Sequence, residues 1–192
     1  MFTGLVEDTA RVEEIKESGE GRRVKLISSI LPETEKGESI SVSGACLTVE
    51  KTGEESAEFF LAEETVEKTW FNELEKGKKL NLERSLTPDD RMGGHIVQGH
   101  VEGTTEVIEI EELKEGWNFT FGKPKSLENY IVHKGFITVE GISLTVTDVT
   151  ENSFSVTVIP ETWDVTSLSE KREGDKVNLE TDIMAKYVEK MV

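Results

Sequence analysis

The side-chain types that most often attack a substrate or move a proton are scarce in this chain. It has one cysteine, Cys46, and three histidines, His95, His100 and His133. A cysteine is nucleophilic as its thiolate, and a histidine exchanges a proton near neutral pH. The same residues could bind a metal, but no His-x-x-x-His pair and no second cysteine accompany them, so no metal site is predicted. The chain also lacks a phosphate loop, a dinucleotide fingerprint and a Gly-x-Ser-x-Gly motif.

Two of these residues also have a purely structural explanation. Cys46 follows two small residues and precedes an apolar run, so it could be a small buried apolar residue, the commoner state of a free cysteine. His100 ends the glycine-rich run 93–100, where glycines either let a ligand approach the backbone or simply form a turn. The residues alone leave both alternatives open.

The elements that position these residues occur twice. Residues 40–49 (ISVSGACLTV) align without a gap with residues 137–146 (ITVEGISLTV), and residues 77–83 align with 174–180. With a small shift, residues 4–12 align with 99–107, so the period is about 96 residues. This is far above the period of about 20–50 residues found in solenoid repeats, so each copy has the size of a domain.

Polar chemistry differs between the two copies at a few aligned positions. Copy one has Ser39, Cys46 and Ser85 where copy two has Phe136, Ser143 and Asp182, and Leu5 and Gly37 align with His100 and Lys134. Two related pockets that present different polar groups would suit an enzyme in which two identical molecules take unequal parts. Ordinary divergence, with one pocket decaying, would give the same pattern.

Each copy is predicted to be a β-structure. Short runs rich in β-branched and aromatic residues alternate with glycine-rich and polar turns, which is typical of a sandwich or a barrel. Residues 62–69, and 160–166 in the second copy, have the most helical composition inside the copies. The turn-forming segment 87–94 places the boundary between the copies near residue 90.

The tail after the second copy predicts a short helix. Asp182 can cap it, and its apolar side would comprise Ile183, Met184, Tyr187, Val188 and Met191. A helix this short needs a surface to pack against. Either its own barrel or another copy of the chain could provide that surface.

Composition narrows the classes of function. The net charge of −17 disfavours nucleic acid as a partner, and no apolar run approaches the length of about 20 residues that a membrane span requires. A single cysteine and an acidic N-terminus without a basic secretory segment predict a cytoplasmic protein.

Five segments, in chain order, resemble the signature motifs of the riboflavin synthase family: 1–6 (MFTGLV), 44–49 (GACLTV), 93–101 (GGHIVQGHV), 134–146 (KGFITVEGISLTV) and 159–162 (IPET). Together they span nearly the whole chain. The resemblance implies an all-β fold of two tandem six-stranded Greek-key β-barrels and a short C-terminal helix. It places the lumazine-binding barrels at 1–90 and 91–182, and it implies that the helix at 183–192 joins the subunits of a homotrimer.

The resemblance also implies a reaction. A transferase of this family moves a four-carbon unit between two molecules of 6,7-dimethyl-8-ribityllumazine, giving riboflavin and 5-amino-6-ribitylamino-uracil without a cofactor or metal. The site is expected between the first barrel of one subunit and the second barrel of a neighbour. Association with lumazine synthase is a further partner to consider, which the sequence leaves open.

Site residues follow from the family motifs position by position. The catalytic candidates are Ser39, Cys46, His100 and Asp182. From the first barrel, the substrate-binding candidates are Phe2, Thr3, Gly4, Leu5, Val6, Cys46, Leu47, Thr48, Phe60, Leu61, Ala62, Glu63, Glu64 and Thr65. From the second barrel they are Gly99, His100, Val101, Lys134, Ser143, Leu144, Thr145, Thr157, Val158, Ile159, Pro160, Glu161 and Thr162. In the expected chemistry, Ser39, Cys46 or a water that they hold adds to the ring of one lumazine, while His100 helps to deprotonate a methyl group of the other. The thiol and Asp182 remain alternatives for the general base.

One alternative is a related protein that binds a lumazine or flavin without converting it and acts as an optical antenna. Such a protein is expected to lack the polar groups that face the ring. Thr3, Ser39, Cys46, His100 and Asp182 are all present here, which favours the enzyme.

Overall fold

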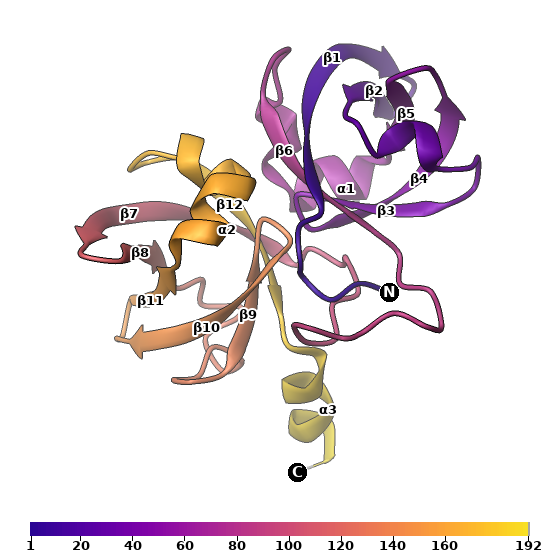
Figure 1. Ribbon diagram of the computed structural model, residues 1–192. Coiled ribbons are helices and arrows are strands. Elements are labelled where there is room, and N and C mark those ends of the chain that lie inside the picture. Colours follow the sequence, from indigo (N-terminus) through magenta and orange to yellow (C-terminus); the bar gives the residue numbers. More distant parts are fainter. Residues whose placement is uncertain (192) are drawn as a thin grey trace.

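The computed structural model describes residues 1–191 as two closed six-stranded antiparallel barrels, one after the other, with a helix that projects at the C-terminus (Figure 1). The first barrel comprises β1 (Asp8–Ser18), β2 (Gly21–Ile27), β3 (Ser39–Val42), β4 (Ala45–Thr52), β5 (Ser56–Leu61) and β6 (Lys79–Arg84). The second comprises β7 (Gly103–Leu113), β8 (Gly116–Gly122), β9 (Phe136–Val139), β10 (Ile142–Val149), β11 (Ser153–Val158) and β12 (Lys176–Thr181).

The two barrels have the same topology. The first closes in the order β1-β2-β5-β4-β3-β6, and the second repeats this cyclic order with β7 to β12. The predicted all-β fold of two tandem barrels is therefore confirmed. Each barrel has its own apolar core, around Phe59 and Leu82 in the first and Phe119 and Leu179 in the second. Along β4, inward Leu47 and Val49 alternate with outward Cys46 and Thr48, as the period of two in a strand requires.

In the part of the chain that the structure describes, three short α-helices and three 3-10 helices, η1 (Leu31–Glu33), η2 (Trp70–Glu73) and η3 (Ser167–Glu170), lie outside the strands. The predicted helical segments form α1 (Glu63–Lys68) and α2 (Pro160–Val165), which follow β5 and β11. The tail forms α3 (Ile183–Met191), while Val192 lies outside the described residues. The predicted cap is confirmed, because the Met184 backbone N–H donates to Asp182 Oδ1 at 3.0 Å. Within residues 1–191, no helix has the length and apolar character to cross a membrane.

The barrels meet at two tight turns related by a pseudo-twofold axis. The turn between β3 and β4 has Ser43 and Gly44 at positive φ, and the turn between β9 and β10 has Glu140 and Gly141 at positive φ, as two-residue hairpins of this kind require. The two turns touch through their backbones. A Cβ added to Gly141 would lie 2.7 Å from the Gly44 nitrogen.

Two buried asparagines connect the barrels beside these turns. Asn81 Nδ2 donates to the Glu140 carbonyl at 2.9 Å, and its Oδ1 accepts from the Ser167 N–H at 2.7 Å. Asn178 makes the equivalent pair, to the Ser43 carbonyl at 2.9 Å and from the Trp70 N–H at 3.1 Å. These four hydrogen bonds satisfy backbone groups that the contact between the barrels removes from water.

The turn contact makes a prediction about stability. We expect Gly141→Ala to lower the free energy of unfolding by about 1–2 kcal/mol for its left-handed backbone, and by roughly 1–3 kcal/mol more because its methyl group would press on the other barrel. Gly174→Ala is the matched control, because Gly174 has a similar φ of +87° and nothing lies within 4 Å of its added Cβ. Urea unfolding of both variants measures the difference. Equal losses would mean that the turn contact is loose enough to give way.

Candidate functional site

Two extended segments cross between the barrels. We call residues 2–6 the first arm and residues 97–101 the second arm. They pair antiparallel with each other, since the Phe2 N–H donates to the Val97 carbonyl at 2.8 Å and the Val97 N–H donates to the Phe2 carbonyl at 3.1 Å. Phe2 and Val97 are both completely buried. The start of the first copy and the start of the second copy therefore form one continuous contact at the centre of the molecule.

A buried glutamate holds each arm. Glu83 accepts from the backbone N–H groups of Thr3 and Gly4, at 2.6 and 2.9 Å, and from the Thr3 hydroxyl at 2.8 Å. Glu180 accepts from the N–H groups of Gln98, Gly99 and His100 at 2.7 to 2.9 Å. Burial raises the pKa of both carboxyls above the usual value, although these hydrogen bonds lower it in part.

Each arm then lies against the hairpin of the other copy. The carbonyl of Gly99 accepts from the Cys46 N–H at 2.8 Å, and the carbonyl of Gly4 accepts from the Ser143 N–H at 2.8 Å. Contact at Cys46 requires a glycine, because a Cβ on Gly99 would lie 2.7 Å from the Cys46 Cβ, and Gly99 has a φ of +78°. In the same way, Val101 of the second arm packs against the core of the first barrel, and Val6 of the first arm packs against the core of the second barrel.

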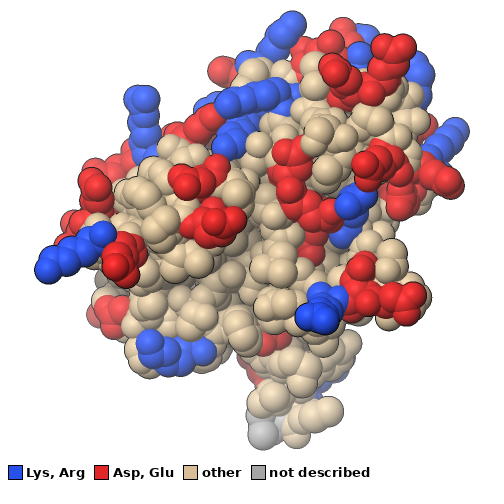
Figure 2. Space-filling model, in the orientation of Figure 1, with Lys and Arg blue, Asp and Glu red and all other residues tan. Residues whose placement is uncertain are grey.

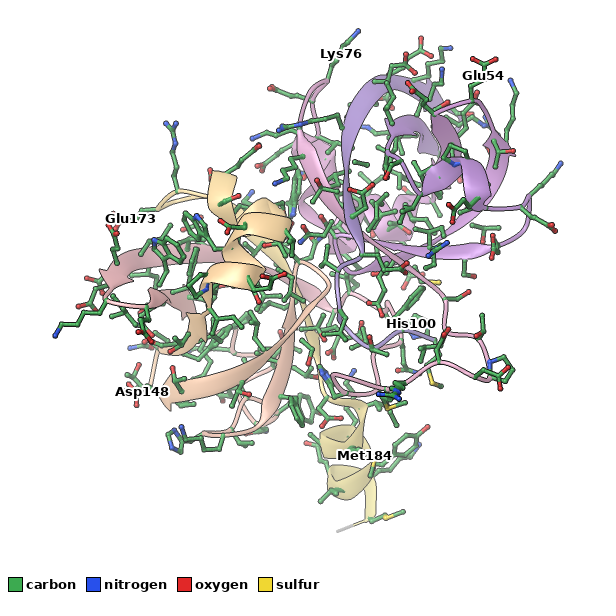
Figure 3. The ribbon with its side chains drawn as sticks, viewed as in Figure 1. Glu54, Lys76, His100, Asp148, Glu173 and Met184 are labelled. Carbon is green, nitrogen blue, oxygen red and sulfur yellow. The ribbon has the colours of Figure 1, made fainter. Side chains whose placement is uncertain are left out.

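This crossing brings Cys46 and His100 together at one cavity. The cavity, of about 450 Å³, lies where the second arm meets β4 and α1 of the first barrel. Its lining consists of Ala45, Cys46, Ala62, Glu64, Thr65, Lys68, Thr69, Gly99, His100 and Val101. Cys46 is exposed, so it is not a buried apolar residue. His100 is also exposed (Figure 3). The Cys46 thiol, the Thr65 hydroxyl and the His100 imidazole can therefore act on a molecule bound in this cavity.

The family motifs led us to expect Gly99, His100 and Val101 in the pocket of the second barrel. The structure places them at the cavity of the first barrel instead, and it places Gly4 beside Ser143 of the second. The reason is the crossing of the arms, which depends on contacts between residues that lie far apart in the chain. Ala45, Lys68 and Thr69 line the cavity without having been predicted. Lys68 and Thr69 follow from α1, since they continue the predicted segment 62–65 by one helical turn.

Other predicted site residues occupy three kinds of place. The barrel interiors and the contact between the arms bury Phe2, Thr3, Gly4, Leu47, Leu61, Leu144 and Val158. Side chains that are exposed on the outer surface are Leu5, Thr48, Phe60, Glu63, Lys134, Thr145, Thr157, Ile159, Pro160 and Glu161. Half-buried positions are those of Val6, Ser39, Ser143, Thr162 and Asp182. Ser39 pairs with Thr48 on the sheet that leads to Cys46, but it does not line the cavity.

The second barrel presents different chemistry at the equivalent place. Ser143 Oγ lies 2.7 Å from Nδ1 of His95, whose ring stacks on Phe136 with centroids 5.0 Å apart. Thr138 Oγ1 lies 3.3 Å from His95 Nε2. Burial lowers the pKa of His95, and the charge of Asp182 opposes this in part. His95 was not predicted as a site residue, because the first copy has no counterpart at that position.

Lys134 occupies a strained position on the second barrel. Its φ of 64° lies in the left-handed region, where the first copy has Gly37 at a φ of 94°. A lysine there carries a conformational cost that glycine avoids, which is the kind of exception found at functional sites. Among residues 1–191, no group of three or more His, Cys, Asp or Glu side chains is arranged to hold a metal ion.

Comparisons with known proteins agree with this architecture. The model of the lumazine binding domain family matches the chain twice, over residues 3–85 and 98–182. Riboflavin synthase of Bacillus subtilis (strain 168) is 41% identical over 189 residues, which cover 98% of this chain and 88% of that protein. Riboflavin synthase of Schizosaccharomyces pombe (strain 972 / ATCC 24843) is 37% identical over 197 residues, which cover all of this chain and 94% of that protein.

Solved structures show the same fold. LumP in complex with riboflavin superposes with a TM-score of 0.87 and 26% sequence identity, over 94% of this chain and 99% of that chain. LumP in complex with 6,7-dimethyl-8-(1'-D-ribityl) lumazine gives a TM-score of 0.86 at 24% identity, with the same coverage. By its two lumazine-binding domains and its full-length similarity to curated relatives, the chain belongs to the riboflavin synthase family.

Proposed function

We propose that this chain makes riboflavin by transferring a four-carbon unit from one molecule of 6,7-dimethyl-8-ribityllumazine to another, with 5-amino-6-ribitylamino-uracil as the second product. The observation that carries the proposal is the cavity lined by Cys46, Thr65 and His100, in a chain similar over its full length to riboflavin synthases. The two products together contain the same atoms as the two substrates, so the reaction needs no external oxidant or reductant.

The size of the cavity indicates how many substrates it holds. At about 450 Å³ it falls in the range of about 300–1,000 Å³ that is usual for small-molecule pockets, and one lumazine with its ribityl chain would fill it. The second lumazine must then lie on another surface. The equivalent surface around Ser143 is separated from Cys46 in the same chain by the paired arms, in which Phe2 and Val97 are fully buried. A reacting pair held face to face therefore requires the second barrel of a neighbouring subunit.

The catalytic roles follow from position at this cavity. Cys46, or a water held there, adds to the ring of the bound lumazine, and His100 takes a proton from a methyl group of a lumazine. Ser39 and Asp182 do not line this cavity. We propose that they act where a neighbouring subunit completes the site. Fixing two substrates in one orientation supplies much of the acceleration, since the reaction becomes effectively intramolecular.

We propose that α3 joins the subunits of a homotrimer. Met184, Tyr187, Val188 and Met191 expose 55%, 57%, 58% and 84% of their surface on one helix that projects from the barrels. Figure 2 shows that few charged side chains lie on the visible face of this projection. A helix of nine residues with an apolar side is stable only when that side is covered.

Our first test of the proposal is an assay of purified protein with 6,7-dimethyl-8-ribityllumazine and a chelator. We expect riboflavin absorption to appear, and we expect His100→Leu, which installs the residue of the first copy, to lower turnover about 100-fold or more with a smaller loss of lumazine binding. His133→Leu is the control, because His133 is an exposed histidine away from the cavity.

Two outcomes would contradict this assignment. If no riboflavin forms and a fluorescent lumazine complex persists, the chain is a binding protein, a possibility that the similarity to LumP supports. If His100→Leu lowers binding and turnover equally, or if His133→Leu matches it, then His100 shapes the cavity without moving a proton.

A second test concerns assembly. Val188→Glu should dissociate the trimer in analytical ultracentrifugation, because it introduces a charge into the apolar side of α3. Lys190→Glu introduces the same side chain on the same helix and should leave the trimer intact. Trimers in both variants would show that α3 is not the contact.

A third test uses the buried histidine of the second barrel. Burial depresses the pKa of His95 below the ordinary 6.5, so the unfolded chain takes up a proton there before the folded chain does. Stability from this group is thus present above pH 6.5 and is lost as the pH falls toward the folded pKa, by up to about 1.4 kcal/mol per pH unit. Urea unfolding from pH 8 to 5 should show this loss in the wild type relative to His95→Gln. A difference that stays constant with pH would mean that His95 titrates normally.

A further inference from the structure

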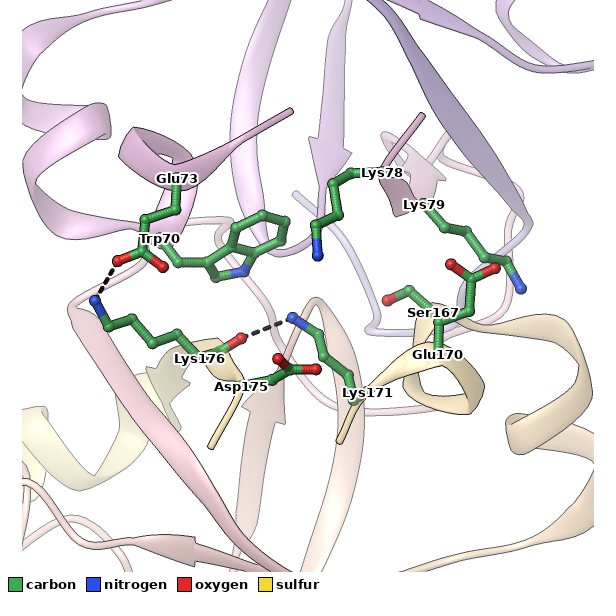
Figure 4. Close-up of a pocket in the computed structure, with 9 residues that line it drawn as sticks. All are labelled: Trp70, Glu73, Lys78, Lys79, Ser167, Glu170, Lys171, Asp175 and Lys176. Carbon is green, nitrogen blue, oxygen red and sulfur yellow. Dashed lines mark hydrogen bonds and ion pairs between the residues drawn. The ribbon is translucent and has the colours of Figure 1, made fainter. Parts of the chain in front are cut away.

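A second, smaller cavity lies between the barrels and shares no lining residue with the cavity beside Cys46. It has a volume of about 110 Å³ (Figure 4). Its walls come from the segment of Trp70 and the start of β6 in the first barrel, and from the segment of Ser167 and the start of β12 in the second. It therefore lies on the pseudo-twofold contact, where the two copies present equivalent segments to each other.

Lysine side chains concentrate at this cleft in a chain whose net charge is −17. Lys78, Lys79, Lys171 and Lys176 line it. Lys79 Nζ donates to the Thr166 carbonyl at 3.0 Å, and Lys176 pairs with Glu73. The ammonium group of Lys78 points into the cavity, and that of Lys171 lies at its wall, where it donates to the Lys176 carbonyl at 2.7 Å (Figure 4). Lys78 comes from the first barrel and Lys171 from the second.

Two carboxylates at the cleft are paired with cations, and a third accepts a backbone hydrogen bond. Glu73 pairs with Lys176, Glu170 pairs with Arg11 at 2.6 Å, and Asp175 Oδ2 accepts from the Arg172 N–H at 2.8 Å. Glu140 lies beneath, 3.6 Å from Lys171, and neutralises part of that lysine's charge. Lys78 has no ion-pair partner within the described residues, so its charge remains available to a ligand.

A buried hydroxyl points into the same space. Ser167 is 2% exposed, and its Oγ has no hydrogen-bond partner in residues 1–191. Buried polar atoms nearly always have a partner, so this hydroxyl indicates that something occupies the cavity. As a donor beside two ammonium groups, it matches an acceptor with several oxygen atoms.

We propose that this cleft binds a small tetrahedral oxyanion of the phosphate or sulfate class, held by Lys78, Lys171 and the Ser167 hydroxyl. The volume of about 110 Å³ admits such an ion, whereas drug-sized and nucleotide-sized ligands need pockets of about 300 Å³ or more. Since its donors come from both barrels, the ion would link the two copies and stabilise their arrangement. Lys171 Nζ also lies 4.3 Å from the centroid of Trp70, which places a fluorescent side chain beside the site.

The test is calorimetric titration of the full-length protein with inorganic phosphate, and separately with sulfate, in chloride buffer at constant ionic strength. We expect saturable binding at one site per chain. Lys78→Met should weaken it about 10-fold or more, as loss of a charged hydrogen bond does. Lys76→Met is the matched control, because it removes the same charge two residues away from a side chain that extends into solvent (Figure 3).

Three outcomes would overturn the proposal. A flat titration of the wild type would mean that water alone fills the cleft. Equal weakening by Lys76→Met and Lys78→Met would mean that phosphate only screens the surface. Tighter binding of glycerol phosphate than of free phosphate would mean that the site extends beyond the cavity. If Lys78→Met does not fold, Ser167→Ala replaces it, and this variant should also weaken phosphate binding relative to the wild type.

Discussion

The buried carboxylates of Glu83 and Glu180 hold the structure together at its centre. Each arm brings several backbone N–H groups into a region without water, where an unpaired donor is costly. A carboxylate that accepts two or three of them satisfies the arm and is itself compensated for its burial, as the hydrogen bonds to Thr3 and Gln98 illustrate. The position of each arm, and therefore the shape of the cavity beside Cys46, depends on these hydrogen bonds to Glu83 and Glu180.

Duplication then gives one scaffold with two kinds of surface chemistry. In the first barrel, Cys46 is exposed beside His100 on the second arm. In the second barrel, the equivalent Ser143 is bound to His95, which is buried against Phe136. The difference in burial matters more than the difference in residue type, since one copy leaves its polar group available to a ligand while the other already engages it with a neighbour. Such asymmetry suits a reaction in which two identical substrates have unequal roles.

Much of the fold could be predicted because strand and helix patterns are local. The alternation of Leu47 and Val49 with Cys46 and Thr48 records which side of β4 faces a core. Asp182 before an apolar stripe predicted a capped helix, and the structure contains both. The site was less predictable. Cys46 and His100 were each predicted as catalytic candidates. Their position at one cavity results from the crossing of the arms, which no local sequence pattern encodes.

By itself, the sequence determined that the chain holds two copies of one β-domain, where the strands and short helices lie, and to which family its motifs belong. Only the tertiary structure decided which arm meets which barrel, that His95 is buried beside Ser143, and that Lys78 and Ser167 face one small cleft. The physical reason is that periodicity reports whether a side chain points inward or outward on its own element. Contacts between residues far apart in the chain, such as Gly99 with Cys46 and Gly4 with Ser143, form only when the whole chain has folded.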